Sequence, residues 1–197
     1  MREILQRMKN ILLRPRAEWE LIKQEQTSLR KLFGGYGALM AAVPPVAALV
    51  ERFLFNRGIV SNAVHSPFLY VITTNLLWYL VILANILITA TIITVIVASK
   101  EPGWVSLRGL QLATYSYTPL FLVAMLAVIP RLGWLIYPAI LYSLYLLYLG
   151  IRSITGAPQG KAAWDAVASF LVTGVVVGIL NGLEYMLESF VASKVFF

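Results

Sequence analysis

The sequence predicts an all-α integral membrane protein: a five-helix transmembrane bundle with a short amphipathic helical segment at its N-terminus. Of its 197 residues 59% are hydrophobic and only 13% are charged, whereas soluble domains carry about 25% charged residues. From Ser66 to Ser99 the chain contains no Asp, Glu, Lys or Arg. A membrane-spanning helix needs about 20 consecutive apolar residues, and this segment is longer. These two observations place the chain in a membrane.

Residues 1–31 are predicted to be a cytoplasmic or interfacial segment containing two short amphipathic helices. Apolar residues recur at helical spacing along the first helix and form one stripe, which consists of Ile4, Leu5, Met8, Ile11 and Leu12. Pro15 suits the first position of the second helix, because the backbone N–H at that position has no intrahelical partner. Trp19 and Ile22 are three residues apart and face the same way. The segment either caps the bundle or offers a docking face to a partner.

Residues 32–197 are predicted to form the bundle itself, with a short tail after the last span. The five spans are expected at about residues 32–50, 68–99, 109–129, 134–151 and 166–183. Proline removes a backbone donor, so Pro44 and Pro45 are expected to kink or end the first span. Pro119 and Pro138 lie within the third and fourth spans. Because the connecting loops are short, neighbouring spans are expected to be antiparallel.

The distribution of basic residues predicts the orientation of the bundle. With five spans the two termini lie on opposite sides of the membrane. The N-terminal side carries twelve of the sixteen Lys and Arg residues, and Lys and Arg are enriched on the cytoplasmic side of membrane proteins. We therefore expect a multi-pass protein of the cell (inner or plasma) membrane, with its N-terminus in the cytoplasm and its C-terminus outside.

The basic residues that precede the first span are candidate contacts for anionic lipid headgroups or for a partner protein, because cationic segments beside a membrane attract anionic lipids. These candidates are Arg2, Arg7, Lys9, Arg14 and Arg16. Nucleic-acid binding is not expected, since the basic segment is short and adjoins a membrane span. The expected partners are membrane lipids, with another membrane protein or a second copy of this chain as further possibilities.

The sequence contains no recognisable catalytic or metal-binding constellation, so we predict a protein that is not an enzyme and needs no cofactor. It has no cysteine and one histidine, His65, which is expected in an external loop. Zinc sites usually need three or four clustered ligands. Glu184 is the candidate intramembrane acid, because a carboxylate inside a membrane is a functional candidate by default. The alternative for Glu184 is a solvated position at the end of the last span.

Polar residues within the spans form a second group of candidates. Asn85 and Thr89 are four residues apart and share a helix face. Pro119 leaves the carbonyl of Tyr115 without its helical donor, which indicates a break in the third span. Tyrosines recur every three residues in the fourth span and could face this break. The resulting polar seam between spans two, three and four contains Asn75, Asn85, Thr89, Tyr115, Tyr117, Thr118, Pro119, Tyr142 and Tyr145. It either fixes helix packing or lines a polar pathway.

Several motifs, taken in order, resemble those of prokaryotic Yip1-family membrane proteins. They are NILLRPRAEWE at 10–20, YSYTPL at 115–120, IP at 129–130, YSLYLLYLGI at 142–151 and GAPQGKA at 156–162. The resemblance covers nearly the whole chain and implies a five-helix membrane domain with a cytoplasmic N-terminus. Eukaryotic members are linked to Golgi and endoplasmic-reticulum trafficking and to Rab GTPases, which are not expected beside these bacterial-type motifs. The resemblance brings no catalytic or binding residues with it.

Two functions agree with these observations. The first is a non-enzymatic membrane-organising, scaffold or partner-binding protein that acts through lipid and protein contacts. The alternative is a small transporter, channel or lipid-moving protein that uses the polar seam.

Overall fold

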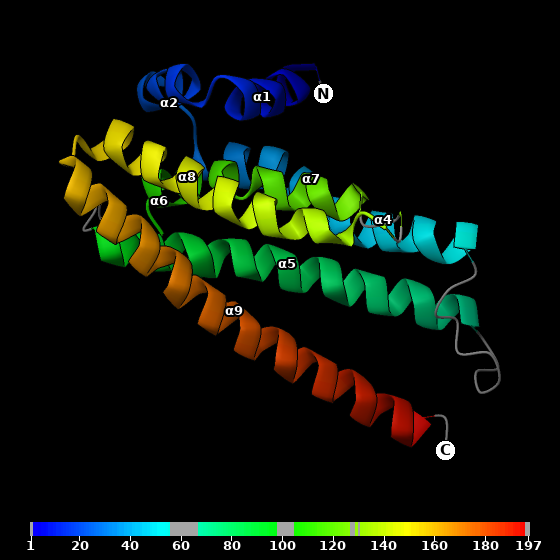
Figure 1. Cartoon of the computed structure of the whole chain (residues 1–197). Coiled ribbons are helices and arrows are strands. Elements are labelled where there is room, and N and C mark those ends of the chain that lie inside the picture. The colour runs from blue at the N-terminus through cyan, green and yellow to red at the C-terminus, as the bar shows by residue number, and fades with distance from the viewer. Residues whose placement is uncertain (1, 56–66, 98–104, 127–128, 130, 196–197) are drawn as a thin grey trace.

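Helices make up all the regular structure in the part of the chain that the computed structural model describes, which is residues 2–55, 67–97, 105–126, 129 and 131–195 (Figure 1). In chain order they are α1 (Arg2–Leu13), α2 (Pro15–Gln24), α3 (Leu29–Lys31), the π-helical turn η1 (Leu32–Gly37), α4 (Ala38–Phe55), α5 (Pro67–Val97), α6 (Leu107–Ser116), α7 (Thr118–Leu126), the 3₁₀ turn η2 (Gly133–Leu135), α8 (Ile136–Thr155) and α9 (Gln159–Val195). The predicted all-α class is confirmed. His65 lies outside the described residues.

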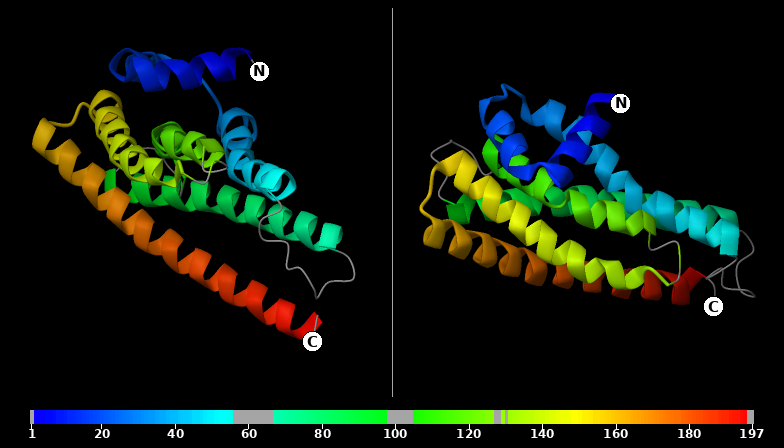
Figure 2. Two further views of the ribbon diagram at one scale, coloured as in Figure 1. Left: turned by 45° about the vertical axis from the view of Figure 1, so that its right-hand side comes forward. Right: turned by 45° about the horizontal axis from the view of Figure 1, so that its top comes forward.

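The long helices run alongside one another as a bundle, in which α5 packs against α4 and α9, and α9 also packs against α8. The start of α5 and the end of α9 lie at one end of this bundle, whereas the end of α5 and the start of α9 lie at the other (Figures 1 and 2). Four stretches among the described residues are long and apolar enough to cross a membrane, namely Leu29–Val50, Ile72–Val97, Gly133–Thr155 and Gln159–Leu183. The chain is therefore a multi-pass membrane protein.

The predicted third span is not one continuous helix. Helix α6 ends at Ser116 and α7 begins at Thr118, so that Tyr117 separates two helices of 10 and 9 residues. Pro119 lies in the first turn of α7, where its missing N–H removes no helical hydrogen bond. The break expected from this proline is therefore confirmed. Each half is too short to cross a membrane alone, and the count of five spans is not confirmed among the described residues.

The structure decides two details of helix ends. Helix α4 contains Pro44 and Pro45 and continues to Phe55, so of the two predicted effects the proline pair does not end the helix. The last apolar stretch ends at Leu183 as predicted, and the tail that follows is helical, because α9 continues to Val195. The segment beyond Gly182 contains neither glycine nor proline up to that point, and nothing in its sequence interrupts the helix.

The most deeply buried element is α6, in which every residue from Gly109 to Ser116 is buried. It packs against α5, α8 and η1. A Cβ at Gly109 would clash with Thr94 Oγ1 and lie 2.7 Å from the carbonyl oxygen of Ala90. The backbones of α5 and α6 thus approach each other at a point that only glycine permits.

Helices α1 and α2, which we call the N-terminal hairpin, form as predicted, with Pro15 as the first residue of α2. The hairpin lies against the bundle (Figure 2), and α2 packs along α8. Ile11, Trp19 and Ile22 have no exposed surface. The predicted apolar stripe of α1 is therefore covered in part by the protein itself, since Ile11 is buried and Leu5 is exposed.

Candidate functional site

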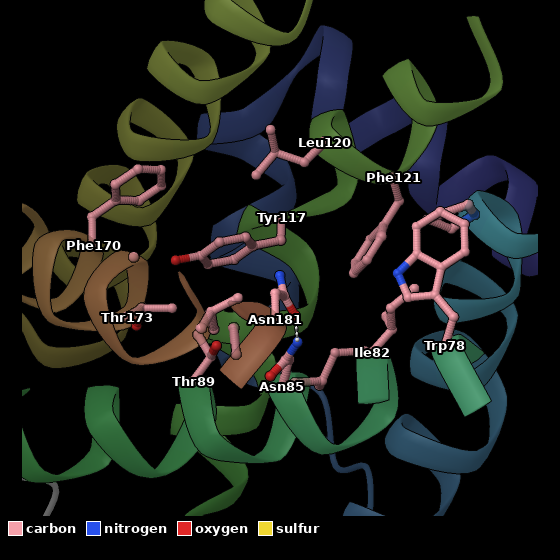
Figure 3. A pocket seen from close by; sticks show the side chains of 15 residues that line it. Trp78, Ile82, Asn85, Thr89, Tyr117, Leu120, Phe121, Phe170, Thr173 and Asn181 are labelled. Carbon is pink, nitrogen blue, oxygen red and sulfur yellow. Dashed lines mark hydrogen bonds between the residues drawn. The ribbon is translucent and has the colours of Figure 1, made fainter. Parts of the chain in front are cut away.

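A cavity of about 360 Å³ lies between α4, α5, the α6–α7 break and α9 (Figure 3). Much of its wall is apolar and aromatic, with Trp78, Phe121 and Phe170 among the lining residues. Asn85 lies on α5, 12 residues before the end of a 31-residue helix. The cavity is therefore close to the middle of a membrane-spanning segment.

The polar residues of the cavity come from three elements that converge on it. Asn85 on α5 donates from Nδ2 to Oδ1 of Asn181 on α9, at 3.4 Å. The side-chain oxygen of Asn85 is buried and has no hydrogen-bond partner among the described residues. Tyr117 reaches the cavity from the break, where its ring stacks on Phe170 with centroids 5.7 Å apart. Its hydroxyl points toward Thr173 of α9 (Figure 3).

The cavity accounts for only part of the predicted polar seam. Asn85, Thr89 and Tyr117 line it, whereas Thr173 and Asn181 were not included in the seam. The spacing of Gly174, Val177 and Asn181 places these three residues on one face of the last span, but it does not indicate that this face meets Asn85.

The remaining seam residues lie elsewhere in the bundle. The Tyr115 ring packs edge-on against Tyr36, with centroids 4.8 Å apart. Thr118 Oγ1 hydrogen-bonds to the hydroxyl of the same Tyr36 at 2.8 Å. Asn75 is buried in α5, and Pro119 is buried in α7. Tyr145 is 39% exposed.

Helix α8 packs against both α6 and α7, but no hydrogen bond joins its tyrosines to the break of the third span among the described residues. Tyr142 instead donates from its hydroxyl to the backbone carbonyl of Leu12 in α1, at 2.6 Å. Tyr115 and Tyr117 are two residues apart on a helical path and so project to roughly opposite sides. Tyr115 consequently faces the hairpin, while Tyr117 faces the cavity.

The hairpin is held to the bundle by a fully buried tryptophan. A Cβ at Gly150 of α8 would lie 2.7 Å from Cζ2 of Trp19 and 2.6 Å from Cδ2 of Leu112. Only glycine at this position leaves room for the indole ring. The Trp19 ring also contacts Tyr115 edge-on, with centroids 6.2 Å apart, so that α2, α6 and α8 meet at this residue.

A partly buried pair of salt bridges closes the hairpin. Arg7 of α1 donates to Glu18 of α2 at 2.6 Å and also to Glu25, which follows α2. The Arg7 guanidinium carbon lies 5.8 Å from the centroid of the Tyr115 ring, within the range of a cation–π contact. On the outer side of α2, Ser153 Oγ donates to Glu20 at 2.8 Å. Arg7 is thus bound within the hairpin, unlike the other predicted basic contacts.

Those other four residues, Arg2, Lys9, Arg14 and Arg16, are all exposed. Leu5 and Leu13 are also exposed on α1, at 56% and 69%. We call the four exposed cations the basic face of the hairpin. Glu184, the predicted intramembrane acid, lies on α9, and its side chain is outside the described part of the structure.

Comparison with known proteins identifies the family. The family model of the Yip1 domain matches residues 9–180, which include most of the hairpin, the α6–α7 break and all the cavity residues discussed above except Asn181. No curated protein and no solved structure matches the chain. Because the matched residues form most of its length, the chain belongs to the Yip1 domain family.

Proposed function

We propose that this protein is a non-enzymatic, membrane-organising member of the prokaryotic Yip1 branch, and that its N-terminal hairpin binds anionic lipid headgroups. The observation that carries the proposal is the division of the hairpin into two faces. Three of its apolar side chains, Ile11, Trp19 and Ile22, are fully buried against the protein. Its basic face is exposed.

The buried face supports electrostatic rather than insertional lipid binding. An amphipathic helix that lies in a membrane interface inserts its apolar side among the lipids. Here Trp19 and Ile22 are buried where α2 packs against α8, and Arg7 is neutralised by Glu18 and Glu25. The hairpin therefore presents a surface of fixed shape to the lipid headgroups. The four cations of the basic face contribute about 1 kcal/mol each beside an anionic membrane.

The topology that we propose places this face on the anionic side of the membrane. We count α6 and α7 together as a broken third crossing, which gives five crossings with α4, α5, α8 and α9. The N-terminus is then cytoplasmic and the C-terminus external, as the excess of Lys and Arg indicates. The cytoplasmic leaflet carries anionic lipids, so the hairpin and its ligands are on the same side.

Transport through the polar seam is not favoured by the arrangement of its residues. They divide between a cavity at Asn85 and Tyr117 and a separate cluster at Tyr36, Tyr115 and Thr118. A transport pathway between spans two, three and four would need these polar groups to line one continuous channel.

Native mass spectrometry of the full-length protein in a neutral detergent tests the proposed lipid binding. Phosphatidylglycerol and phosphatidylcholine are titrated against the native protein and a variant with Arg2, Lys9, Arg14 and Arg16 all changed to Gln. We expect the native preference for phosphatidylglycerol to fall at least tenfold in the variant and also at high salt, which screens exposed charges.

Arg131→Gln is the control. Arg131 is an exposed cation just before α8, at the end of that helix away from Gly150 and Ser153, which contact α2. The control variant should retain the preference for phosphatidylglycerol. If the variant lacking the basic face binds both lipids as the native protein does, the proposal is wrong. A protein that co-purifies with the native chain and is lost from this variant would instead assign the basic face to a protein partner.

A further inference from the structure

We propose that the cavity between α4, α5, the α6–α7 break and α9 binds an uncharged lipid with a long apolar chain and a single hydroxyl group. The proposal does not depend on the hairpin, which lies on another side of the bundle (Figures 1 and 2).

The size and walls of the cavity suit an apolar ligand. Its volume of about 360 Å³ is within the range of about 300–1,000 Å³ that is usual for small-molecule sites. Trp78, Phe121 and Phe170 provide a large aromatic surface (Figure 3). Such walls favour a hydrocarbon chain over a cluster of water molecules, which would need several polar partners each.

The polar groups of the cavity indicate which polar group the bound lipid has. Each asparagine amide offers two donors and an acceptor with two lone pairs, yet Asn85 and Asn181 share one hydrogen bond, and the Asn85 oxygen has no partner among the described residues. The Asn85 oxygen is closed off from the cavity, whereas the amide nitrogen of Asn181 points into it (Figure 3). A ligand hydroxyl can accept from this Asn181 N–H and donate to the second lone pair of Asn181 Oδ1.

The charge of the site excludes an ionic headgroup. None of the described residues that line the cavity is Asp, Glu, Lys or Arg. A phosphate or carboxylate placed there would be buried without a counter-ion, which is strongly unfavourable. The hydroxyl is therefore the polar end of a neutral amphiphile rather than part of a phospholipid headgroup.

The position of the cavity allows such a ligand to enter from the membrane. Gly174 and Asn181 line the cavity and are also exposed on α9, so the cavity reaches the surface of a membrane-spanning helix. Asn85 is 12 residues from the end of α5, which corresponds to about 18 Å along the helix. A phospholipid keeps its headgroup at the membrane surface, whereas a neutral alcohol can bring its hydroxyl to this depth.

Photolabelling of the full-length protein in phosphatidylcholine nanodiscs tests the site. The probe is hexadecanol with a diazirine near its far end, and labelled peptides are located by mass spectrometry. Gly174→Leu fills the cavity, and Gly178→Leu is its matched control. A Cβ at either glycine meets no atom within 4 Å, but only Gly174 lines the cavity. We expect labelling of the cavity helices to fall at least tenfold in Gly174→Leu and to be unchanged in Gly178→Leu.

Competition with unlabelled compounds tests the role of the hydroxyl. Hexadecanol should compete about fivefold better than hexadecane, as expected for one hydrogen bond, and Asn181→Leu should remove this difference while the apolar chain of the ligand still binds. Thr91→Val is the control on α5, because the Thr91 hydroxyl bonds to the carbonyl of Leu87 within its own helix.

Three results would overturn the proposal. The first is an absence of labelling on the cavity helices, and the second is labelling that persists in Gly174→Leu. The third is equal competition by hexadecane and hexadecanol in the native protein, which would show that the cavity holds hydrocarbon without selecting a hydroxyl.

Discussion

The indole ring of Trp19 on α2 packs directly against Gly150 of α8, in the space that a side chain at position 150 would fill. An added Cβ at Gly150 would lie 2.7 Å from the indole ring, and Trp19 itself has no exposed surface. This contact fixes the N-terminal hairpin to the membrane bundle and so determines which face of the hairpin remains free.

Gly150→Ala should therefore loosen the hairpin. Overpacking of a well-packed site costs about 1–3 kcal/mol, and the nearest atoms belong to Trp19 and Leu112. We expect faster amide hydrogen exchange across 15–24 and a lower melting temperature in detergent. Gly160→Ala is the control, because a Cβ at Gly160 meets nothing within 4 Å. Equal exchange in the two variants would show that the Trp19 contact does not hold the hairpin.

Arg7→Met should destabilise the hairpin although the residue belongs to a strongly basic segment. The substitution leaves Glu18, which is 4% exposed, without its charged partner, and we expect a loss of about 2 kcal/mol. The double variant Arg7→Met/Glu18→Gln should recover part of this loss. Thermal unfolding measures both effects. Arg16→Gln, at an exposed position, should change the stability by no more than about 0.5 kcal/mol. A loss of similar size in Arg16→Gln would contradict a specific role for Arg7.

Tyr142→Phe should weaken the attachment of α1 by removing the hydrogen bond to the Leu12 carbonyl. A partly buried hydrogen bond of this kind contributes about 1 kcal/mol, so exchange should increase in α1 and at the α1–α2 junction. The neighbouring Tyr145 provides the matched control, since its side chain is 39% exposed and Tyr145→Phe removes no hydrogen bond found among the described residues. Indistinguishable hydrogen exchange in the two variants would show that the hydrogen bond from Tyr142 to Leu12 does not hold α1 in place.

Gly109→Ala should disturb the bundle itself rather than the hairpin. Its Cβ would press on Thr94 and on the Ala90 carbonyl, which is backbone and cannot rotate away. We expect a loss of about 1–3 kcal/mol, measured as a lower yield of monodisperse protein and a lower melting temperature. Gly133→Ala, where a Cβ has open space, should behave as the native protein. A fully stable Gly109→Ala variant would show that α5 and α6 do not approach so closely.

The features that the sequence predicted correctly are those that depend on neighbouring residues in the chain. Apolar length identifies the spans, and the apolar stripe with Pro15 identifies the two helices of the hairpin. Pro119 predicts the break after α6 because proline acts on the helix that contains it. Each of these patterns lies within about twenty consecutive residues, so it can be recognised without knowing which distant residues are in contact.

The candidate sites were predicted less well because they depend on which distant residues meet. Arg7 has the same local signature as Arg14 and Arg16, and only its contacts with Glu18 and Glu25 set it apart. Tyr115 and Tyr117 were grouped because they are close in the sequence, yet they face different partners. Asn181 joins Asn85 from 96 residues away, a pairing that no local pattern indicates.

The most direct test of the central claim is hydrogen exchange of the native protein in nanodiscs of phosphatidylcholine and of phosphatidylglycerol. A docked hairpin with a basic face predicts slow exchange across 15–24 in both lipids. It also predicts additional protection of residues 2–16 in phosphatidylglycerol, which the variant with Arg2, Lys9, Arg14 and Arg16 changed to Gln should lose. Fast exchange of α2 in both lipids would contradict the docking of the hairpin. Identical protection of residues 2–16 in the two lipids would contradict its binding of anionic headgroups.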